Sequence, residues 1–340
     1  IMQIFDADLT NWSEVGGPDD SILVFRLDDI TSYATEQELG ADLSRAPQCL
    51  SRIVADHPNM IAYLPEQYVA PDFAGKVLGE GRITPASFFA GRQWYPTAAP
   101  APQYGLIPLL AGTLWVSLAA ILIALPLGLS VAIYMAELAG HRLRNLLKPV
   151  IELLAGIPSV VYGFFGMIVL VPAVQAMVKT PFFKTVLHVK SGKGMSLFTA
   201  AVLLGIMILP TIITVSKTSL DAVPESYYEG SLALGATHER SVFYAVLPAA
   251  KSGVLSAVIL GIGRAIGETM AVVMVAGNQT WMPKGLFQGL RTMTSNIVIE
   301  MGYAADLHRE ALIATGVVLF VFILLINLCF SLVKGGKDYA

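Results

Sequence analysis

Charged residues are scarce in this chain, and their scarcity excludes most soluble folds. Only 14% of the 340 residues are Asp, Glu, Lys or Arg, whereas 55% are hydrophobic and the mean hydropathy is +0.64. Soluble globular domains carry about 25% charged residues. No cluster of Lys and Arg of the kind that binds nucleic acid is present in the sequence. The composition therefore predicts a polytopic membrane protein.

Sequence signatures of catalysis and of metal binding are also missing. The histidines lie far apart, without the spacing that metal ligands need. Gly192-Lys193 does not complete a phosphate-binding loop, because the required glycine and the Ser or Thr are replaced by Leu187 and Gly194. We therefore expect no enzyme activity, no metal and no cofactor. If ATP drives this protein, another chain hydrolyses it.

The chain has long apolar runs instead. They span residues 106–136, 153–178, 195–216, 252–277 and 311–333. Only the fourth contains charged residues, Arg264 and Glu268. A helix needs about 20 apolar residues to cross a bilayer, so each run is long enough. Five buried helices of a large soluble protein are the alternative, which uncharged runs of this length disfavour. We predict five membrane spans.

Acidic residues are concentrated before the first span. Residues 1–105 hold 14 Asp or Glu against 6 Lys or Arg, and residues 106–340 hold 11 against 16. Short β-type runs and helix-like stretches, such as 36–46, alternate near the N-terminus between Gly- and Pro-containing turns. We predict the following division: an α/β domain over 1–95, a linker over 96–105 and a transmembrane domain over 106–335. Lys and Arg in the loops number eight on one side and seven on the other, so they do not orient the spans.

A polar segment, residues 217–251, separates the third and fourth spans. Within it, Glu225–Leu234 is predicted to form a short helix that ends at Gly235, because glycine accepts the left-handed conformation of many helix ends. His238–Val246 is predicted to form a second helix before Leu247-Pro248. Such an elbow suits the docking of a partner protein, and an interfacial amphipathic helix explains the same pattern. The spacing alone leaves both interpretations open.

The same segment resembles the EAA motif of ABC-importer permeases. The matching residues are Glu229-Gly-Ser-x-x-x-Gly235 and, after nine residues, Ala245-x-Leu247-Pro248. Across about 88–335 the chain is similar to phosphate-specific permeases of the PstC type. The segments that carry this similarity are Tyr104–Thr113, Ile151–Gly163, Ile208–Thr211 and Gly263–Val272. The family has one more span before these five, which predicts further sequence upstream of Ile1.

The resemblance implies a fold, a function and partners. The fold is the all-α polytopic bundle of a type I ABC-importer permease, and the function is ATP-driven import of inorganic phosphate across the bacterial cytoplasmic (inner) membrane. The implied partners are ABC ATPase subunits, a second permease subunit, a periplasmic phosphate-binding protein and membrane lipid. Residues 217–251 are then cytoplasmic, with Glu229, Gly235, Leu247 and Pro248 coupling the chain to the ATPase. A permease for another oxyanion, or a secondary transporter, is the alternative.

Two ionisable residues interrupt the fourth span. Arg264 and Glu268 are four residues apart, so a continuous helix would place them on one face near mid-membrane. A charge there costs about 2.5–3.5 kcal/mol on insertion scales, so such residues usually have a function. An ion pair that only helps packing is one interpretation. The other is an anion site in the substrate path, where the planar fork of Arg264 binds phosphate oxygens and Glu268 neutralises it when the site is empty. The resemblance favours the second.

The N-terminal segment carries a separate resemblance. Leu9–Asp19, Val24–Asp28 and Pro58–Tyr63 are similar to segments of periplasmic phosphate-binding proteins. The match departs at Asp29–Ser32, where binding proteins have a Ser-Gly-Thr loop whose donors hold phosphate, and Asp29 would repel an anion. We therefore expect 1–95 to be a degenerate, binding-protein-like extracytoplasmic domain that docks the true binding protein or serves only as structure. A competent phosphate site in this segment is the less favoured alternative.

Overall fold

The protein divides into two compact units. The computed structural model describes residues 2–5, 7–40, 43–65, 68–76, 78, 84–98, 102–181 and 194–335. The first unit comprises Ile1–Phe88 and Tyr95–Tyr104, and the second comprises Phe89–Trp94 and Gly105–Ala340.

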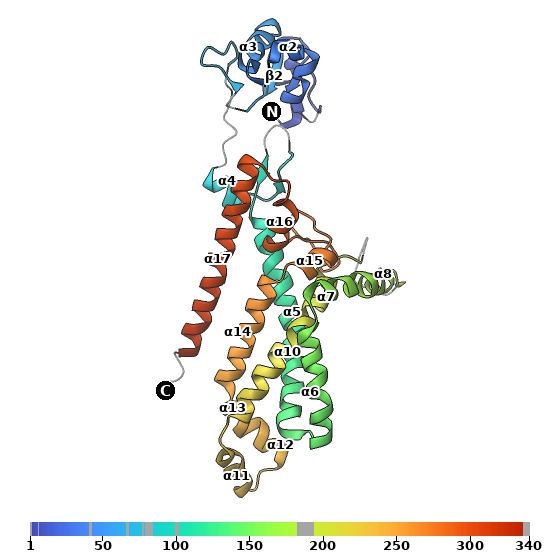
Figure 1. The fold of residues 1–340 in the computed structure, drawn as a ribbon, viewed down its shortest axis with the longest axis vertical. Helices are drawn as coiled ribbons and strands as arrows, with labels where there is room; N and C mark the ends of the chain where they lie inside the picture. The colour runs from blue at the N-terminus through green and yellow to red at the C-terminus, as the bar shows by residue number, and fades with distance from the viewer. Residues whose placement is uncertain are drawn as a thin grey trace. The chain divides into compact units, whose positions relative to one another are not determined.

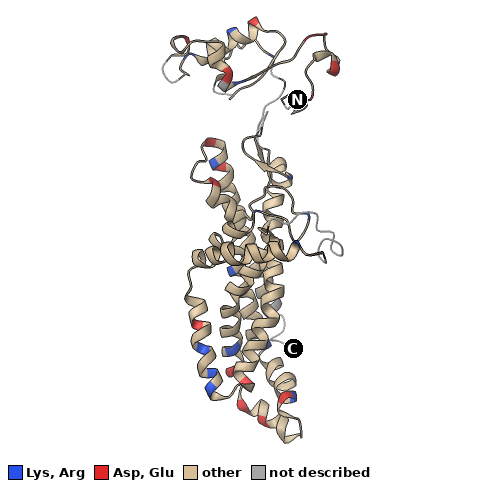
Figure 2. Cartoon of the chain, turned by 90° about the vertical axis from the view of Figure 1, so that its right-hand side faces the viewer, with Lys and Arg blue, Asp and Glu red and all other residues tan. Residues whose placement is uncertain are grey.

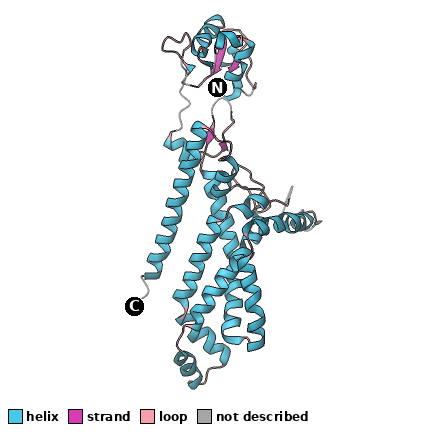
Figure 3. Ribbon diagram, viewed as in Figure 1, coloured by secondary structure: helices cyan, strands magenta, loops and turns pink. Residues whose placement is uncertain are grey.

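The first unit is a small α/β structure (Figure 3). Strands β1 (Leu23–Arg26) and β2 (Met60–Tyr63) pair in parallel, with Leu23 opposite Met60 and Arg26 opposite Tyr63. Parallel strands need a crossover, which is supplied here by α2 (Glu36–Leu39) and α3 (Ala46–Asp56). The stretch 36–46 is therefore not one helix. Helix α2 ends at Gly40, which has a left-handed φ of 74°.

The remaining short elements lie on either side of this crossover or lead to the second unit. Those in the described residues are α1 (Met2–Phe5), α4 (Pro85–Ala90), β3 (Trp94–Tyr95), β4 (Gln103–Tyr104) and the 3₁₀ turns Trp12–Val15 and Leu27–Ser32. The core of the first unit is formed mainly by α3, which buries Ala46, Cys49, Leu50 and Ile53 against Phe25 of β1. These positions recur at helical spacing, so one face of α3 is apolar.

The second unit consists almost entirely of helices (Figures 1 and 3). They are α5 (Ile107–Ile133), α6 (His141–Gly156), α7 (Ser159–Phe165), α8 (Val171–Val178), α10 (Leu197–Asp221), α11 (Glu225–Ala233), α12 (His238–Ser241), α13 (Leu247–Ala249), α14 (Lys251–Gly267), α15 (Met270–Val275), α16 (Met293–Glu300) and α17 (Asp306–Gly335). Three π-helical turns join them: Tyr134–Leu138, Gly166–Leu170 and Val242–Val246. Charged residues are sparse along the long helices (Figure 2).

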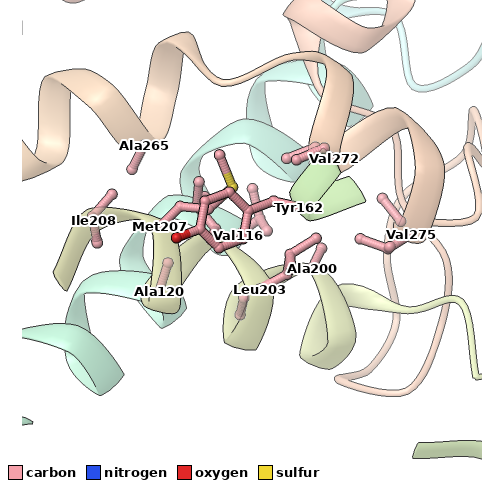
Figure 4. Packing of buried hydrophobic residues seen from close by; sticks show 14 of the residues in the cluster. Val116, Ala120, Tyr162, Ala200, Leu203, Met207, Ile208, Ala265, Val272 and Val275 are labelled. Carbon is pink, nitrogen blue, oxygen red and sulfur yellow. The ribbon is translucent and has the colours of Figure 1, made fainter. Parts of the chain in front are cut away.

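Helix α10 lies at the centre of this unit, where it packs against both α5 and α14. Leu203, Met207 and Ile208 of α10 are each at most 2% exposed. Figure 4 shows Met207 and Ile208 lying among side chains from α5, α7 and α14, including Ala120, Tyr162 and Ala265. The partners contributed by α5 and α14 are small, so the helices can approach closely at this place.

Two glycines of α5 make this close approach possible. A Cβ at Gly128 would lie 2.8 Å from Cγ2 of Ile212, and a Cβ at Gly112 would lie 2.3 Å from the carbonyl oxygen of Arg291. The first position sets the distance between α5 and α10. The second seats the loop that precedes α16 directly on α5, where Thr113 Oγ1 accepts a hydrogen bond from the Met293 amide at 3.0 Å.

A buried ionic cluster joins α16 and α17 to the start of the unit. Glu300 forms an ion pair with Arg291, and its Oε2 lies 2.8 Å from Nε2 of His308 and accepts a hydrogen bond from Trp94 Nε1 at 2.7 Å. The Glu300 side chain is only 4% exposed, and Trp94 is fully buried. A buried carboxylate needs such partners, because an unpaired charge in this position would be strongly destabilising.

The predicted second span, 153–178, begins later than expected. Helix α6 continues through Gly156, and a new helix starts only at Ser159. The cause is Pro158, which lacks an amide hydrogen and forces the preceding residue out of the helical region. Ile157 accordingly has an extended ψ of 127°. Residues 153–156 therefore belong to α6, an amphipathic helix.

The predicted fourth span, 252–277, is not one continuous helix. Helix α14 ends at Gly267, Glu268 is extended with φ −70° and ψ 130°, and α15 begins at Met270. Glycine at 263 and 267 weakens the helix, and the break is stabilised by hydrogen bonds described below.

Four helices in the described residues are long and apolar enough to cross a membrane. They are Ile107–Leu138, Ser159–Val178, Leu197–Asp221 and Asp306–Phe330. A fifth candidate consists of two pieces, His238–Ala249 and Lys251–Gly267, bent by 69°. The predicted number of spans is reached only when this bent pair is taken as one crossing.

Replacement of Gly112 by Ala tests the packing of α5. The added Cβ would collide with a backbone carbonyl that cannot rotate away, so we expect the Gly112→Ala protein to lose about 1–3 kcal/mol of stability. The matched control is Gly156→Ala, because a Cβ there meets nothing within 4 Å. Thermal unfolding in detergent should show a lower midpoint for Gly112→Ala alone. Equal midpoints for the two variants would contradict the packing described here.

Candidate functional site

Arg264 lies in the last turn of α14, half-buried, rather than in the middle of a long span. A cation at this end is favoured, because the C-terminus of a helix carries partial negative charge. The guanidinium NH1 donates a hydrogen bond of 3.1 Å to Oγ1 of Thr211 on α10. The partner of Arg264 is therefore a neutral hydroxyl on the central helix.

Glu268 occupies the break between α14 and α15. Its Oε1 accepts a hydrogen bond of 3.3 Å from the Ala271 amide and so caps the start of α15. Its backbone carbonyl accepts a hydrogen bond of 3.1 Å from Oγ1 of Thr294, which is buried on α16. The side chain and the backbone carbonyl of Glu268 are thus both hydrogen-bonded to groups other than Arg264.

The prediction that Arg264 and Glu268 share one helix face is therefore wrong. That prediction assumed a continuous helix, and α14 ends one residue before Glu268. Within the described parts of the chain, no ion pair joins these two side chains. Arg264 keeps N–H groups that no carboxylate occupies, which is the arrangement an anion needs.

The face of α14 that carries Arg264 has open space beside it. Positions 260, 263, 264 and 267 fall on one side of a helix. Leu260 is 53% exposed, and a Cβ at Gly263 or Gly267 would meet nothing within 4 Å. Gly261 is different, because a Cβ there would lie 3.3 Å from Ile212 of α10. Gly261 therefore allows α14 to pack closely against α10.

Two hydroxyl residues of this region were not predicted from the sequence. Thr211 lies in the segment Ile208–Thr211 that carries the family resemblance, and a polar residue in an apolar run was an available signal. Thr294 lies in a segment between predicted spans, where a threonine has no distinctive pattern. Neither contact follows from local spacing, because Thr211 is 53 residues from Arg264 and Thr294 is 26 residues from Glu268.

The elbow, residues 225–249, is a second candidate site, and its predicted helices are confirmed. Helix α11 ends at Ala233, and Gly235 adopts the left-handed φ of 86° that the prediction required. Helix α12 then begins at His238, where Oγ1 of Thr237 accepts a hydrogen bond from the Arg240 amide. The two helices are turned back on each other around a position where any other residue would be strained.

Hydrogen bonds between α11 and the following helix give the elbow a defined shape. The Tyr228 hydroxyl lies 2.5 Å from Nδ1 of His238, and Ser241 Oγ donates to Ser231 Oγ at 3.0 Å. Below them, Val242 and Val246 are buried in a cluster with Ile133, Leu220 and Ala250. The elbow is therefore packed directly on the ends of α5 and α10.

The outer side of the elbow exposes large apolar side chains. Leu234 is 91% exposed and Tyr244 is 78% exposed, with the Arg240 guanidinium 5.8 Å from the Tyr244 ring. Glu229 and Pro248 are also exposed, whereas Leu247 is half-buried. Exposed apolar residues gathered on one short segment are typical of a protein-contact surface.

The described residues contain no group of three or more His, Cys, Asp or Glu placed to hold a metal ion.

Comparison with known proteins gives a family for this arrangement. The family described as "Binding-protein-dependent transport system inner membrane component" matches residues 124–335. The chain is 41% identical over 251 residues to the "Probable ABC transporter permease protein YqgH" of Bacillus subtilis, covering 72% of this chain and 77% of that protein. It is 37% identical over 250 residues to the "Phosphate transport system permease protein PstC" of Mesorhizobium japonicum, covering 71% and 75%.

A solved structure supports the same fold. The MetNI methionine ABC transporter, in an inward-facing form, matches with a TM-score of 0.50 at 19% identity, over 68% of this chain and 94% of that one. At this identity the likeness concerns the fold alone. Together with the family match, it confirms the prediction of an all-α polytopic permease bundle of the ABC-importer type. The chain belongs to the family of binding-protein-dependent transport system inner membrane components.

Proposed function

We propose that this chain is the permease subunit of an ATP-driven ABC importer that moves inorganic phosphate across the cytoplasmic membrane. The observation that carries the proposal is Arg264, a half-buried cation near the end of α14 that is bound to a hydroxyl and not to a carboxylate. The relatives that are named phosphate permeases, such as the one from Mesorhizobium japonicum, agree with phosphate as the anion.

In this proposal Arg264 and Glu268 line the substrate path. The guanidinium presents a planar fork of donors to the oxygens of a phosphate ion. In the described conformation the Glu268 side chain lies at the start of α15, where its Oε1 accepts a hydrogen bond from the Ala271 amide. It therefore does not compete with the anion for Arg264. A rearrangement of the break between α14 and α15 would bring the carboxylate toward the cation and favour release of the anion.

The elbow is proposed to couple the permease to its motor. Residues 217–251 then face the cytoplasm, and the exposed Glu229 and Pro248, with Leu247 beside them, contact ABC ATPase subunits. Gly235 sets the turn between the two helices that enter the contact. The buried cluster of Val242, Val246, Ile133 and Leu220 supports this role, because movement of the elbow would be passed directly to α5 and α10. ATP is hydrolysed by the partner chains.

The same proposal assigns roles to the other parts of the chain. Residues 106–335 form the transmembrane domain beside a second permease subunit, and 96–105 link it to the N-terminal segment. Residues 1–95 lie outside the cytoplasm and dock a periplasmic phosphate-binding protein. The parallel strands β1 and β2 with the crossover helix α3 agree with a small piece of a binding-protein lobe.

Replacement of Arg264 by Gln tests the substrate path. We expect phosphate-dependent ATPase activity and phosphate uptake of the reconstituted complex to fall about 10- to 100-fold, because a hydrogen bond to a charged group contributes about 1.5–3 kcal/mol. The control is Arg309→Gln, since Arg309 is exposed in the first turn of α17. Co-purification of the ATPase should be unchanged in both variants.

The outcomes separate the alternatives. Normal phosphate uptake by Arg264→Gln would rule out this residue as part of the path. Stimulation of the wild-type complex by another oxyanion, and not by phosphate, would favour a permease for that anion. Purification without any ATPase would favour a secondary transporter.

Replacement of Gly235 by Val tests the elbow. A β-branched residue at a left-handed φ costs about 1–2 kcal/mol, so the turn between α11 and α12 should open. We expect weaker co-purification of the ATPase and faster hydrogen exchange over 225–249. Gly230→Ala is the matched control, because Gly230 lies within α11 and a Cβ there meets nothing within 4 Å. An unchanged ATPase contact in Gly235→Val would argue against this role of the elbow.

A further inference from the structure

The hydroxyl of Thr211 is bound to a neighbouring helix, unlike the hydroxyls of Thr218 and Ser219 on the same helix α10. Thr218 and Ser219 of α10 each donate to the backbone carbonyl four residues earlier, at 2.9 and 2.7 Å. This is the usual way in which a hydroxyl in an apolar helix is satisfied. Thr211 makes no such bond in the described structure, and its recorded partner is Arg264.

The direction of the Thr211–Arg264 bond leaves a donor available. Arg264 has only N–H groups, so it must donate, and the Thr211 oxygen must accept. The hydroxyl hydrogen of Thr211 is not used in that bond. The guanidinium of Arg264 has five N–H donors, of which this bond uses one. A hydroxyl and a guanidinium that touch at 3.1 Å can therefore direct their remaining hydrogens to one shared acceptor.

The position of the pair also suits a bound anion. Both side chains are half-buried, which strengthens electrostatic contacts relative to bulk water. Space is available on the same face of α14, because Gly263 and Gly267 have no neighbours within 4 Å of a Cβ position. The nearby carboxylate, Glu268, is held by the Ala271 amide and does not occupy the guanidinium.

We propose that Thr211 is a second binding residue for the transported oxyanion, donating its hydroxyl hydrogen to an anion oxygen that Arg264 also contacts. This inference rests on the proposed function, because it deepens the same site. The site then draws its donors from two helices, α10 and α14. A tetrahedral oxyanion bridges them, so binding of the substrate strengthens the contact between these two helices at the break.

Substrate affinity measured in the complete reconstituted complex tests this inference. Thr211→Val keeps the shape of the side chain and removes the donor, and Thr211→Ser keeps the donor. We expect the phosphate KM of uptake to rise about tenfold in Thr211→Val, as loss of about 1.4 kcal/mol of binding would give, with the maximal rate little changed. Thr211→Ser should stay close to wild type.

Thr214→Val is the matched control. Thr214 lies on the same helix, is exposed, and loses the same hydroxyl, so its KM should not change. If Thr211→Val does not assemble, Thr211→Ala and Thr211→Ser form the comparison in its place. A hydroxyl that only holds the Arg264 side chain in place would instead give a reduced maximal rate with an unchanged KM.

The results distinguish this inference from the function on which it rests. An unchanged KM in Thr211→Val, or an equal rise in Thr211→Val and Thr211→Ser, overturns the role of Thr211. If Arg264→Gln is inactive while Thr211→Val is normal, only the present inference fails. If Arg264→Gln also transports normally, the proposed substrate path fails with it.

Discussion

Close packing of α10 against α5 and α14 is the constraint on which the rest of the membrane unit depends. The contact is made by small residues on the outer helices, among them Ala120, Gly128 and Gly261, against larger side chains of α10. Because the interior is filled, the distance between α10 and α14 cannot change without loss of packing contacts. The contact between Thr211 and Arg264 exists only at that distance.

The same helix connects the two candidate sites. Thr211 lies in the middle of α10, and Leu220 near its end is buried under the elbow with Val242 and Val246. Helix α5 takes part in both regions as well, through Ala120 and Ile133. A force applied to the elbow therefore reaches Arg264 through packed helices, without a flexible segment between them. In the proposed function, this packing couples ATP hydrolysis by a partner chain to movement of the anion near Arg264.

The break at Glu268 separates the two charged residues of the candidate site. A continuous helix would have placed a carboxylate one turn from Arg264, and the pair would have neutralised itself. Capping of α15 by the Glu268 side chain and the bond from Thr294 to its carbonyl stabilise a separated arrangement. The cation on α14 is thus kept free of Glu268 by the contacts that Glu268 makes to α15 and α16.

Local patterns in the sequence determined much of this protein. The uncharged runs predicted the long apolar helices, and Gly235 between two polar helix-forming stretches predicted the elbow with its left-handed turn. Pro158 acts locally in the same way, because it separates α6 from α7. These features depend on residues close together in the chain, so composition and spacing suffice to find them.

Only the tertiary structure decided which groups meet at the candidate site. Arg264 and Glu268 were both identified from the sequence, but their spacing suggested a pair that the fold separates. Thr211 meets Arg264 across 53 residues, and Thr294 meets Glu268 across 26. Such contacts depend on how helices pack and on where a helix breaks. At the break, the Thr294 hydroxyl from a distant part of the chain bonds the Glu268 carbonyl, which local helix propensity does not foresee. No local pattern carries that information.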